Sequence, residues 1–149
     1  MPSLYTEIEI NAPRERVWQT LIRKDGWKYW NTFLYDCNPK LPLVQGGEVW
    51  LSVRRLPGEA ETEFQPIVTL VQPEVCLKWI SSIPGFVHEQ VFEFQAIGRD
   101  YTRYVHQGNF SGALTRLILP FIRQDEQQGI RRMARELKRY SETRRDRGE

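Results

Sequence analysis

The segment ALTRLILPFIRQDEQQGIRRMARELKRYSETRR, Ala113 to Arg145, decides the fold, because no other segment is long enough for a major helix. Its apolar residues recur at the spacing of one helix face in two groups: Leu114, Leu117, Ile118, Phe121 and Ile122, then Ile130, Met133, Ala134, Leu137 and Tyr140. Pro120 predicts a kink or a second start near the beginning of the helix. The polar stretch 123–128 interrupts the stripe, which favours an opening or a bend where the helix faces its neighbours.

Regularly spaced Gly and Pro residues divide the chain before this helix into short strand-like runs. Apolar and polar residues alternate with a period of two over 49–54, 77–80, 86–95 and 101–110. Pro66 cannot donate a hydrogen bond to a neighbouring strand, so the strand expected over Thr62 to Val71 carries a bulge or bend there. The short loops between consecutive strands favour an antiparallel meander.

The N-terminal segment predicts one more strand and two short helices. Leu4 to Ile10 alternates as a half-buried strand does. Asn11 is expected to cap a helix of about three turns, with Pro13 in its first turn and an end near Asp25-Gly26. The aromatic piece Trp27 to Phe33 predicts another helical turn before the chain enters the sheet.

Together these elements predict an α+β fold, in which a curved antiparallel sheet of about seven strands wraps around one long C-terminal helix. At 149 residues the chain fits a single domain over 1–149, with about 143–149 frayed. A single helix on a strongly curved sheet leaves room between the two. Room that is lined with aromatic residues is typical of a ligand site.

Composition and charge exclude several classes of partner. The formal net charge of +2 is too small for a dedicated polyanion-binding protein. The strand aromatics alternate with acids such as Glu89 and Glu93, so we expect no nucleic-acid partner. From Arg123 onward nine basic residues face six acidic ones, which indicates a solvated helix face and leaves a transient membrane-surface contact open. No segment has the apolar length of a membrane span, so integral membrane association is not expected.

The two cysteines, Cys37 and Cys76, lie far apart and lack metal-ligand spacing, so they are expected to be reduced thiols. The first ten residues contain acids where a signal peptide would have a basic start. A cytoplasmic location is therefore expected.

Four motifs, in order along the chain, carry a resemblance to a known superfamily: INAPRERVWQTL (Ile10 to Leu21), WNTF (Trp30 to Phe33), LKW (Leu77 to Trp79) and TRYVHQGNFSG (Thr102 to Gly112). They resemble the opening strand-to-helix segment, the W-N-P-F signature, the L-x-W strand and the passage into the last helix of the START-like or Bet v 1-like superfamily, also called SRPBCC. The similarity spans nearly the whole chain. It implies the helix-grip fold.

The resemblance implies a cavity for a hydrophobic ligand, but it does not select a function. The superfamily includes lipid carriers, receptors for hydrophobic ligands and polyketide aromatase/cyclases. Thr32 replaces the proline of the signature. Gln90 lies where many bacterial relatives have a histidine, and Gly108 lies where they often have an acid, so polar roles at these two positions do not carry over.

The candidate site consists of aromatic and polar residues on the inner faces of the strands and on the last helix. The residues expected to line the cavity are Leu51, Phe64, Trp79, His88, Gln90, Phe92, Tyr104, His106, Phe110 and Phe121. The sequence contains no phosphate-binding loop, zinc-protease motif or nucleophile elbow. We therefore expect no cofactor, no metal and no dedicated catalytic residue.

The leading interpretation is a cofactor-independent protein that encloses a small hydrophobic or amphipathic molecule, lipid-like or polyketide-like, and is not primarily an enzyme. One alternative is an aromatase/cyclase-type enzyme in which Tyr104, His106 or Arg103 transfers protons. Another is a protein-interaction module with a filled core, which would use the exposed Trp50 and the basic tail. The sequence leaves the oligomeric state open.

Overall fold

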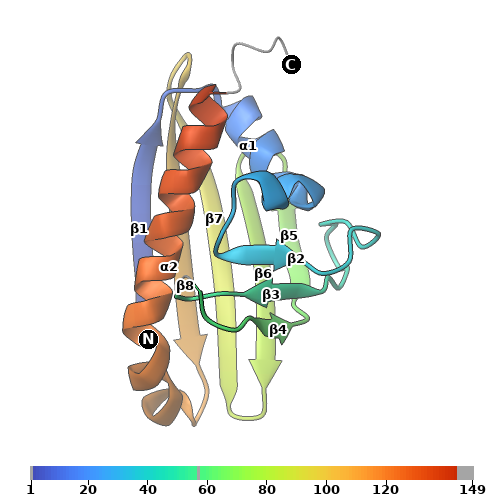
Figure 1. Ribbon diagram of the computed structural model, residues 1–149, viewed down its shortest axis with the longest axis vertical. Helices are drawn as coiled ribbons and strands as arrows, with labels where there is room; N and C mark the ends of the chain where they lie inside the picture. Colours follow the sequence, from blue (N-terminus) through green and yellow to red (C-terminus); the bar gives the residue numbers. More distant parts are fainter. Residues whose placement is uncertain (1, 57, 144–149) are drawn as a thin grey trace.

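The computed structural model describes residues 2–56 and 58–143, and it has the α+β architecture that the sequence predicts (Figure 1). The elements follow one another in this order: β1 (Ser3–Ile10), α1 (Arg14–Ile22), the 3-10 helix η1 (Lys24–Tyr29), β2 (Leu34–Asp36), β3 (Leu51–Val53), β4 (Thr62–Phe64), β5 (Ile67–Gln72), β6 (Cys76–Ile83), β7 (Phe86–Gly98), β8 (Tyr101–Ser111) and α2 (Thr115–Thr143). The expected fraying of about 143–149 falls, apart from Thr143, outside the described part of the chain, and so do Arg144, Arg145 and Arg147.

The strands form two antiparallel sheets, of five strands in the order β1-β8-β7-β6-β5 and of three strands in the order β2-β3-β4. Figure 1 shows α2 and the small sheet on the same face of the large sheet. In the register of β7 and β8, His88 is opposite Phe110 and Phe92 is opposite His106, so these four side chains point to the covered face. The alternation over 101–110 is confirmed, because its even-numbered residues are all buried.

The chain passes from the small sheet to the large sheet at Pro66, whereas the sequence predicts only a bulge or bend within one strand. β4 pairs with β3 in the small sheet, whereas β5 pairs with β6 in the large sheet. The peptide at Pro66 has no N–H to continue the ladder, and its carbonyl accepts a hydrogen bond from the Val49 N–H (3.1 Å). The single strand expected over Thr62 to Val71 is therefore two strands, and the described chain has eight strands rather than about seven.

The two short helices after β1 are present, but their ends differ from the prediction. Pro13, not Asn11, is the N-cap of α1, and no side chain caps it. The helix ends at Ile22 and a 3-10 helix begins at Lys24, so the chain changes helix type where a single longer helix was expected. The Trp27 indole N–H donates to the Leu21 carbonyl (2.9 Å), which fixes the second helix against the first.

Two members of the N-terminal half of the apolar stripe of α2 face solvent, although Ile122 of the same half packs against the core. Leu117 is 65% exposed and Phe121 is 84% exposed, whereas Thr115 and Leu119 are buried. A helix without a restart keeps one phase, and the buried residues Ile130, Met133 and Leu137 set it. Traced back along the helix, that phase reaches Glu126, Leu119 and Thr115 and places Leu117 and Phe121 on the opposite side. Pro120 lies inside the helix and does not restart it.

Polar contacts fasten α2 to the small sheet. The Arg132 guanidinium donates to the carbonyls of Arg54 (2.7 Å) and Arg55 (3.2 Å), and its Nε donates to the Thr32 hydroxyl (2.9 Å). Glu136 accepts hydrogen bonds from the N–H and the hydroxyl of Thr32. The loop after β3 is thus tied to the helix through its main chain. Within the described residues, no helix is both long and apolar enough to cross a bilayer.

Candidate functional site

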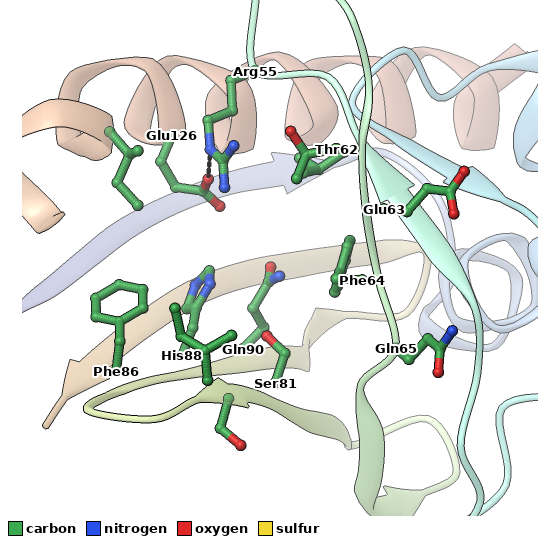
Figure 2. A pocket seen from close by; sticks show the side chains of 14 residues that line it. Arg55, Thr62, Glu63, Phe64, Gln65, Ser81, Phe86, His88, Gln90 and Glu126 are labelled. Atoms are coloured by element: carbon green, nitrogen blue, oxygen red, sulfur yellow. Dashed lines mark hydrogen bonds and ion pairs between the residues drawn. The ribbon is translucent and has the colours of Figure 1, made fainter.

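A pocket of about 630 Å³ lies where α2, the β3–β4 segment and the β6–β7 hairpin meet (Figure 2). Its apolar lining comes from both sheets and from α2: Val53, Phe64, Ile83, Phe86 and Ile122. Its polar lining consists of Arg55, Thr62, Glu63, Gln65, Ser81, Ser82, His88, Gln90 and Glu126. The pocket is therefore amphipathic, and its size fits a small organic molecule.

An ion pair closes the α2 side of this pocket. Arg55 Nε donates to Glu126 Oε1 at 2.7 Å, and Figure 2 shows the two side chains meeting from the loop and from the helix. The side chain of Glu126 is 2% exposed and that of Arg55 is 26% exposed. Burial raises the pKa of the Glu126 carboxyl above its ordinary value, and the neighbouring Arg55 charge acts in the opposite direction.

His88 reaches the pocket from β7 as a neutral side chain. Burial, with a smaller contribution from the charge of Arg55, lowers the pKa of His88 to about 4. Its ring stacks on Phe110, with centroids 4.3 Å apart. A Cβ at position 108 would lie 3.1 Å from His88 Nε2, so Gly108 gives the ring room to lie against β8. In the neutral ring one nitrogen donates a hydrogen bond and the other accepts one.

Gln90 joins the pocket to the buried interior. Its Oε1 lies 2.7 Å from His106 Nε2, and because an amide oxygen only accepts, His106 carries its hydrogen on Nε2. His106 has no exposed surface, and burial followed by the influence of His88 lowers its pKa to about 3. His106 therefore positions Gln90 from behind and is held in one tautomer.

The structure brings three of the predicted cavity residues, Phe64, His88 and Gln90, together at this pocket. Six others are buried in the core and do not line it: Leu51, Trp79, Phe92, Tyr104, His106 and Phe110. They pack on one another, as in the Trp79–Phe92 ring contact at 4.8 Å. Phe121 points away from the pocket into solvent, so the prediction that it faces the sheet is wrong.

The three residues named for acid–base chemistry do not meet at the pocket. Burial raises the pKa of Tyr104, which is fully enclosed. Arg103 lies on the outer face of β8 and pairs with Glu7 (3.4 Å) and Glu9 (3.5 Å). It lies away from the pocket, because odd-numbered residues of this strand point away from α2.

Sequence reasoning missed the ion pair that closes the pocket. Glu126 falls in the polar stretch 123–128, which did indicate an opening in the interface of the helix. Its burial follows from the phase of the helix, which only the second half of α2 reveals. No sequence pattern predicts that Arg55 faces the pocket, because it lies in a loop next to a strand of only three residues. Within the described residues, no group of three or more His, Cys, Asp or Glu side chains could hold a metal ion.

Solved structures show how widely this arrangement of elements occurs. A START superfamily protein from Mycobacterium smegmatis superposes with a TM-score of 0.71 at 16% identity, over 95% of this chain and 97% of that one. A protein from Thermus thermophilus superposes with a TM-score of 0.70 at 17% identity, over 94% and 97% of the two chains.

Norcoclaurine synthase from Thalictrum flavum, solved in complex with dopamine and hydroxybenzaldehyde, superposes with a TM-score of 0.66 at 14% identity, over 93% of this chain and 85% of that one. No family model matches the chain, and no curated protein matches its sequence. Identities this low show the fold alone. The long terminal helix, the curved antiparallel sheet and these superpositions together show that the chain has the START-like, Bet v 1-like helix-grip fold.

Proposed function

We propose that this protein binds a small amphipathic molecule in the pocket between the sheets and α2. The observation that carries the proposal is the pocket of about 630 Å³ with apolar walls and a few converging polar groups. A pocket of this size also favours ligand binding over an interaction module with a filled core. One structure of the same fold, norcoclaurine synthase, was solved with dopamine and hydroxybenzaldehyde. This complex supports the proposal of a small organic ligand.

Apolar contact alone gives only weak binding. Burying about 300 Å² of apolar ligand surface at ~25 cal/mol/Å² contributes roughly 7.5 kcal/mol before any cost of association. A micromolar dissociation constant already needs about 8.2 kcal/mol net. The polar groups of the pocket must therefore supply the remainder, and His88, Gln90 and Arg55 are three of those that line it.

The charges of the pocket favour a ligand whose polar group is uncharged. His88 is neutral at pH 7, and the Arg55 charge is already paired with Glu126 at 2.7 Å. A carboxylate ligand would have to compete with Glu126 for Arg55 and would lie near a second acid, Glu63. An alcohol, phenol or ketone can instead hydrogen-bond to His88 or Gln90 without displacing a charge.

The experiment is displacement of an environment-sensitive apolar dye from the purified protein by a matched set of medium-chain probes, an alcohol, a methyl ketone and a carboxylate. We expect the alcohol and the ketone to displace the dye more effectively than the carboxylate at pH 7. The variants Phe64→Ala and His88→Gln should weaken displacement about tenfold. Ile67→Ala, at a half-exposed position outside the pocket, is the matched control. If none of the probes displaces the dye, or if Ile67→Ala weakens binding as much as Phe64→Ala does, the proposal fails.

A second candidate function is acid–base catalysis on a polyketide-like substrate. The observation that favours it is the presence of two titratable groups with displaced pKa values, His88 and Glu126, in one pocket. Here His88 would accept a proton, in place of the buried Tyr104 and His106. Turnover of a reactive β-polyketone that survives unchanged in His88→Gln would remove this candidate.

A further inference from the structure

The outward side of α2 carries a line of exposed residues that the core does not use. Seven positions within this helix lie at spacings of three and four residues, and all are exposed: Leu117, Phe121, Gln124, Gln128, Arg131, Arg135 and Arg139. Such spacings keep the side chains on one side of a helix. With a rise of about 1.5 Å per residue the line is about 33 Å long. We call these seven residues the outer line of α2.

The outer line divides into an apolar end and a basic end. Leu117 (65% exposed) and Phe121 (84% exposed) form the apolar end. Arg131, Arg135 and Arg139 form the basic end, and Arg116 and Arg123 are exposed beside the apolar end. The acidic residues of the same helix are less exposed than these arginines: Glu126 is buried, and Asp125, Glu136 and Glu142 are half-buried. The exposed surface of α2 is therefore positively charged.

A neighbouring hairpin extends the apolar end. The Leu114 N–H donates to the Gly85 carbonyl at 2.8 Å, which holds the β6–β7 turn against the start of α2. Ile83 in this hairpin is 58% exposed and Leu114 is 38% exposed. In Figure 1 the turn and the first turns of α2 lie at the same end of the molecule. Four large exposed apolar side chains thus lie at this end of the molecule.

We propose that the outer line of α2, together with Ile83 and Leu114, docks on an anionic lipid bilayer. Apolar side chains at one end can enter the boundary between headgroups and acyl chains, while arginines along the same line contact lipid phosphates. This is the complementarity of an interfacial helix that lies on a membrane. It does not require a span, and none is found in the described residues.

Other partners fit the outer line less well. A second copy of the chain would face it with the same charges: parallel pairing brings arginine against arginine, and antiparallel pairing brings Phe121 against Arg131 or Arg135. A nucleic acid would match the arginines but has no partner for four exposed aliphatic and aromatic side chains. The bilayer is the one surface that offers phosphate and hydrocarbon within a few ångströms of each other.

The proposed surface also borders the pocket. Ile83 belongs to both, and Ile122, the neighbour of Phe121, lines the pocket from α2. The outer line itself faces away from the pocket, so the edge at Ile83 is where an amphipathic molecule would pass between the lipid surface and the pocket. This last step rests on the proposed ligand binding, whereas docking itself does not.

The experiment is flotation of the purified protein with phosphatidylcholine vesicles that either contain or lack phosphatidylglycerol. We expect binding to the anionic vesicles, decreasing as salt is added. An arginine near an anionic surface contributes about fivefold to partitioning, so Arg131→Gln/Arg135→Gln should reduce it about thirtyfold. Leu117→Ser/Phe121→Ser should reduce it at least tenfold. Tyr29→Ser and Arg99→Gln, at exposed positions on other elements, should leave it unchanged.

Three results would overturn the proposal. The first is failure to float with anionic vesicles, and the second is unchanged flotation of Leu117→Ser/Phe121→Ser with an unaltered unfolding temperature. The third is a concentration-dependent dimer, seen by sedimentation, that the same variants convert to a monomer, which would assign the surface to a second copy. Dye displacement measured in the absence of lipid separates these results from a failure of the ligand-binding proposal.

Discussion

Replacing Arg55 by methionine leaves the Glu126 carboxyl in a buried place without its partner. The pair is a charge-assisted hydrogen bond of 2.7 Å, and the Glu126 side chain is 2% exposed. Losing such a bond costs roughly 1.5–3 kcal/mol. Because Arg55 is about a quarter exposed, the lower part of this range applies, about 2 kcal/mol at pH 8. For a domain of this length that corresponds to a fall of roughly 4–8 °C in Tm.

The cost of Arg55→Met should depend on pH, with a sign that follows from linkage. Burial gives Glu126 a pKa in the folded protein that is higher than in the unfolded chain, so the folded state binds its proton more tightly. Its contribution to stability is therefore largest below the unfolded pKa of about 4.3 and declines as pH rises to the folded pKa. Removing the Arg55 charge raises the folded pKa further, so the variant should be more destabilised at pH 8 than at pH 5.

Urea unfolding at the two pH values, in the wild-type and Glu126→Gln backgrounds, measures this effect. In the Glu126→Gln background Arg55→Met should cost little and should show a much weaker pH dependence, which also separates Glu126 from the influence of Arg55 on His88. The refuting result is a cost of Arg55→Met that is the same at pH 5 and pH 8, or the same in both backgrounds. Either would mean that Arg55 contributes packing rather than charge at this site.

Three further predictions address the core. His88 and His106 have pKa values of about 4 and about 3, below that of a histidine in the unfolded chain. The free energy of unfolding should therefore fall by about 4 kcal/mol for the two together between pH 7 and pH 5. Histidine NMR titrations with midpoints near 6.5 would contradict this. A Cβ on Gly129 would clash with the Phe33 ring, so Gly129→Ala should lower stability by about 1–3 kcal/mol despite the better helix propensity of alanine. Gly26→Ala is the control, because a Cβ at Gly26 meets open space and should not lower stability. Equal Tm values for the two variants would disprove the close packing at Gly129. Leu119→Ala should cost about 2–5 kcal/mol of stability, and Phe121→Ala less than about 0.5 kcal/mol. The reverse order in thermal unfolding would mean that Phe121, as the sequence predicts, faces the core.

The sequence predicts the strands of the large sheet well, because their alternation reports one buried face. The inward residues of β8 were predicted correctly, since a single register decides all of them together. α2 was predicted in its extent but not in its phase. Leu117 and Phe121 are apolar at helical spacing, and only tertiary packing reveals that the second half of the helix determines which side is buried.

The predicted cavity residues that line the pocket all lie on strands, and their role in binding stays a prediction. Phe64, His88 and Gln90 are these residues. Arg55 comes from a loop, and the depth of Trp79 and Phe92 depends on how the small sheet closes over the large one. Local sequence pattern does not encode that closure, because the chain changes sheets at Pro66.

The hydrogen bonds from Arg132 to the loop after β3 have an evolutionary consequence. The Arg132 guanidinium binds the carbonyl oxygens of Arg54 and Arg55, which every amino acid supplies. Substitutions along this rim can therefore alter shape and polarity toward a guest molecule while the scaffold keeps its place. The side chain of Arg55 stays coupled to Glu126 of the helix, so recognition can change one residue at a time only at rim positions that the helix holds through the main chain alone.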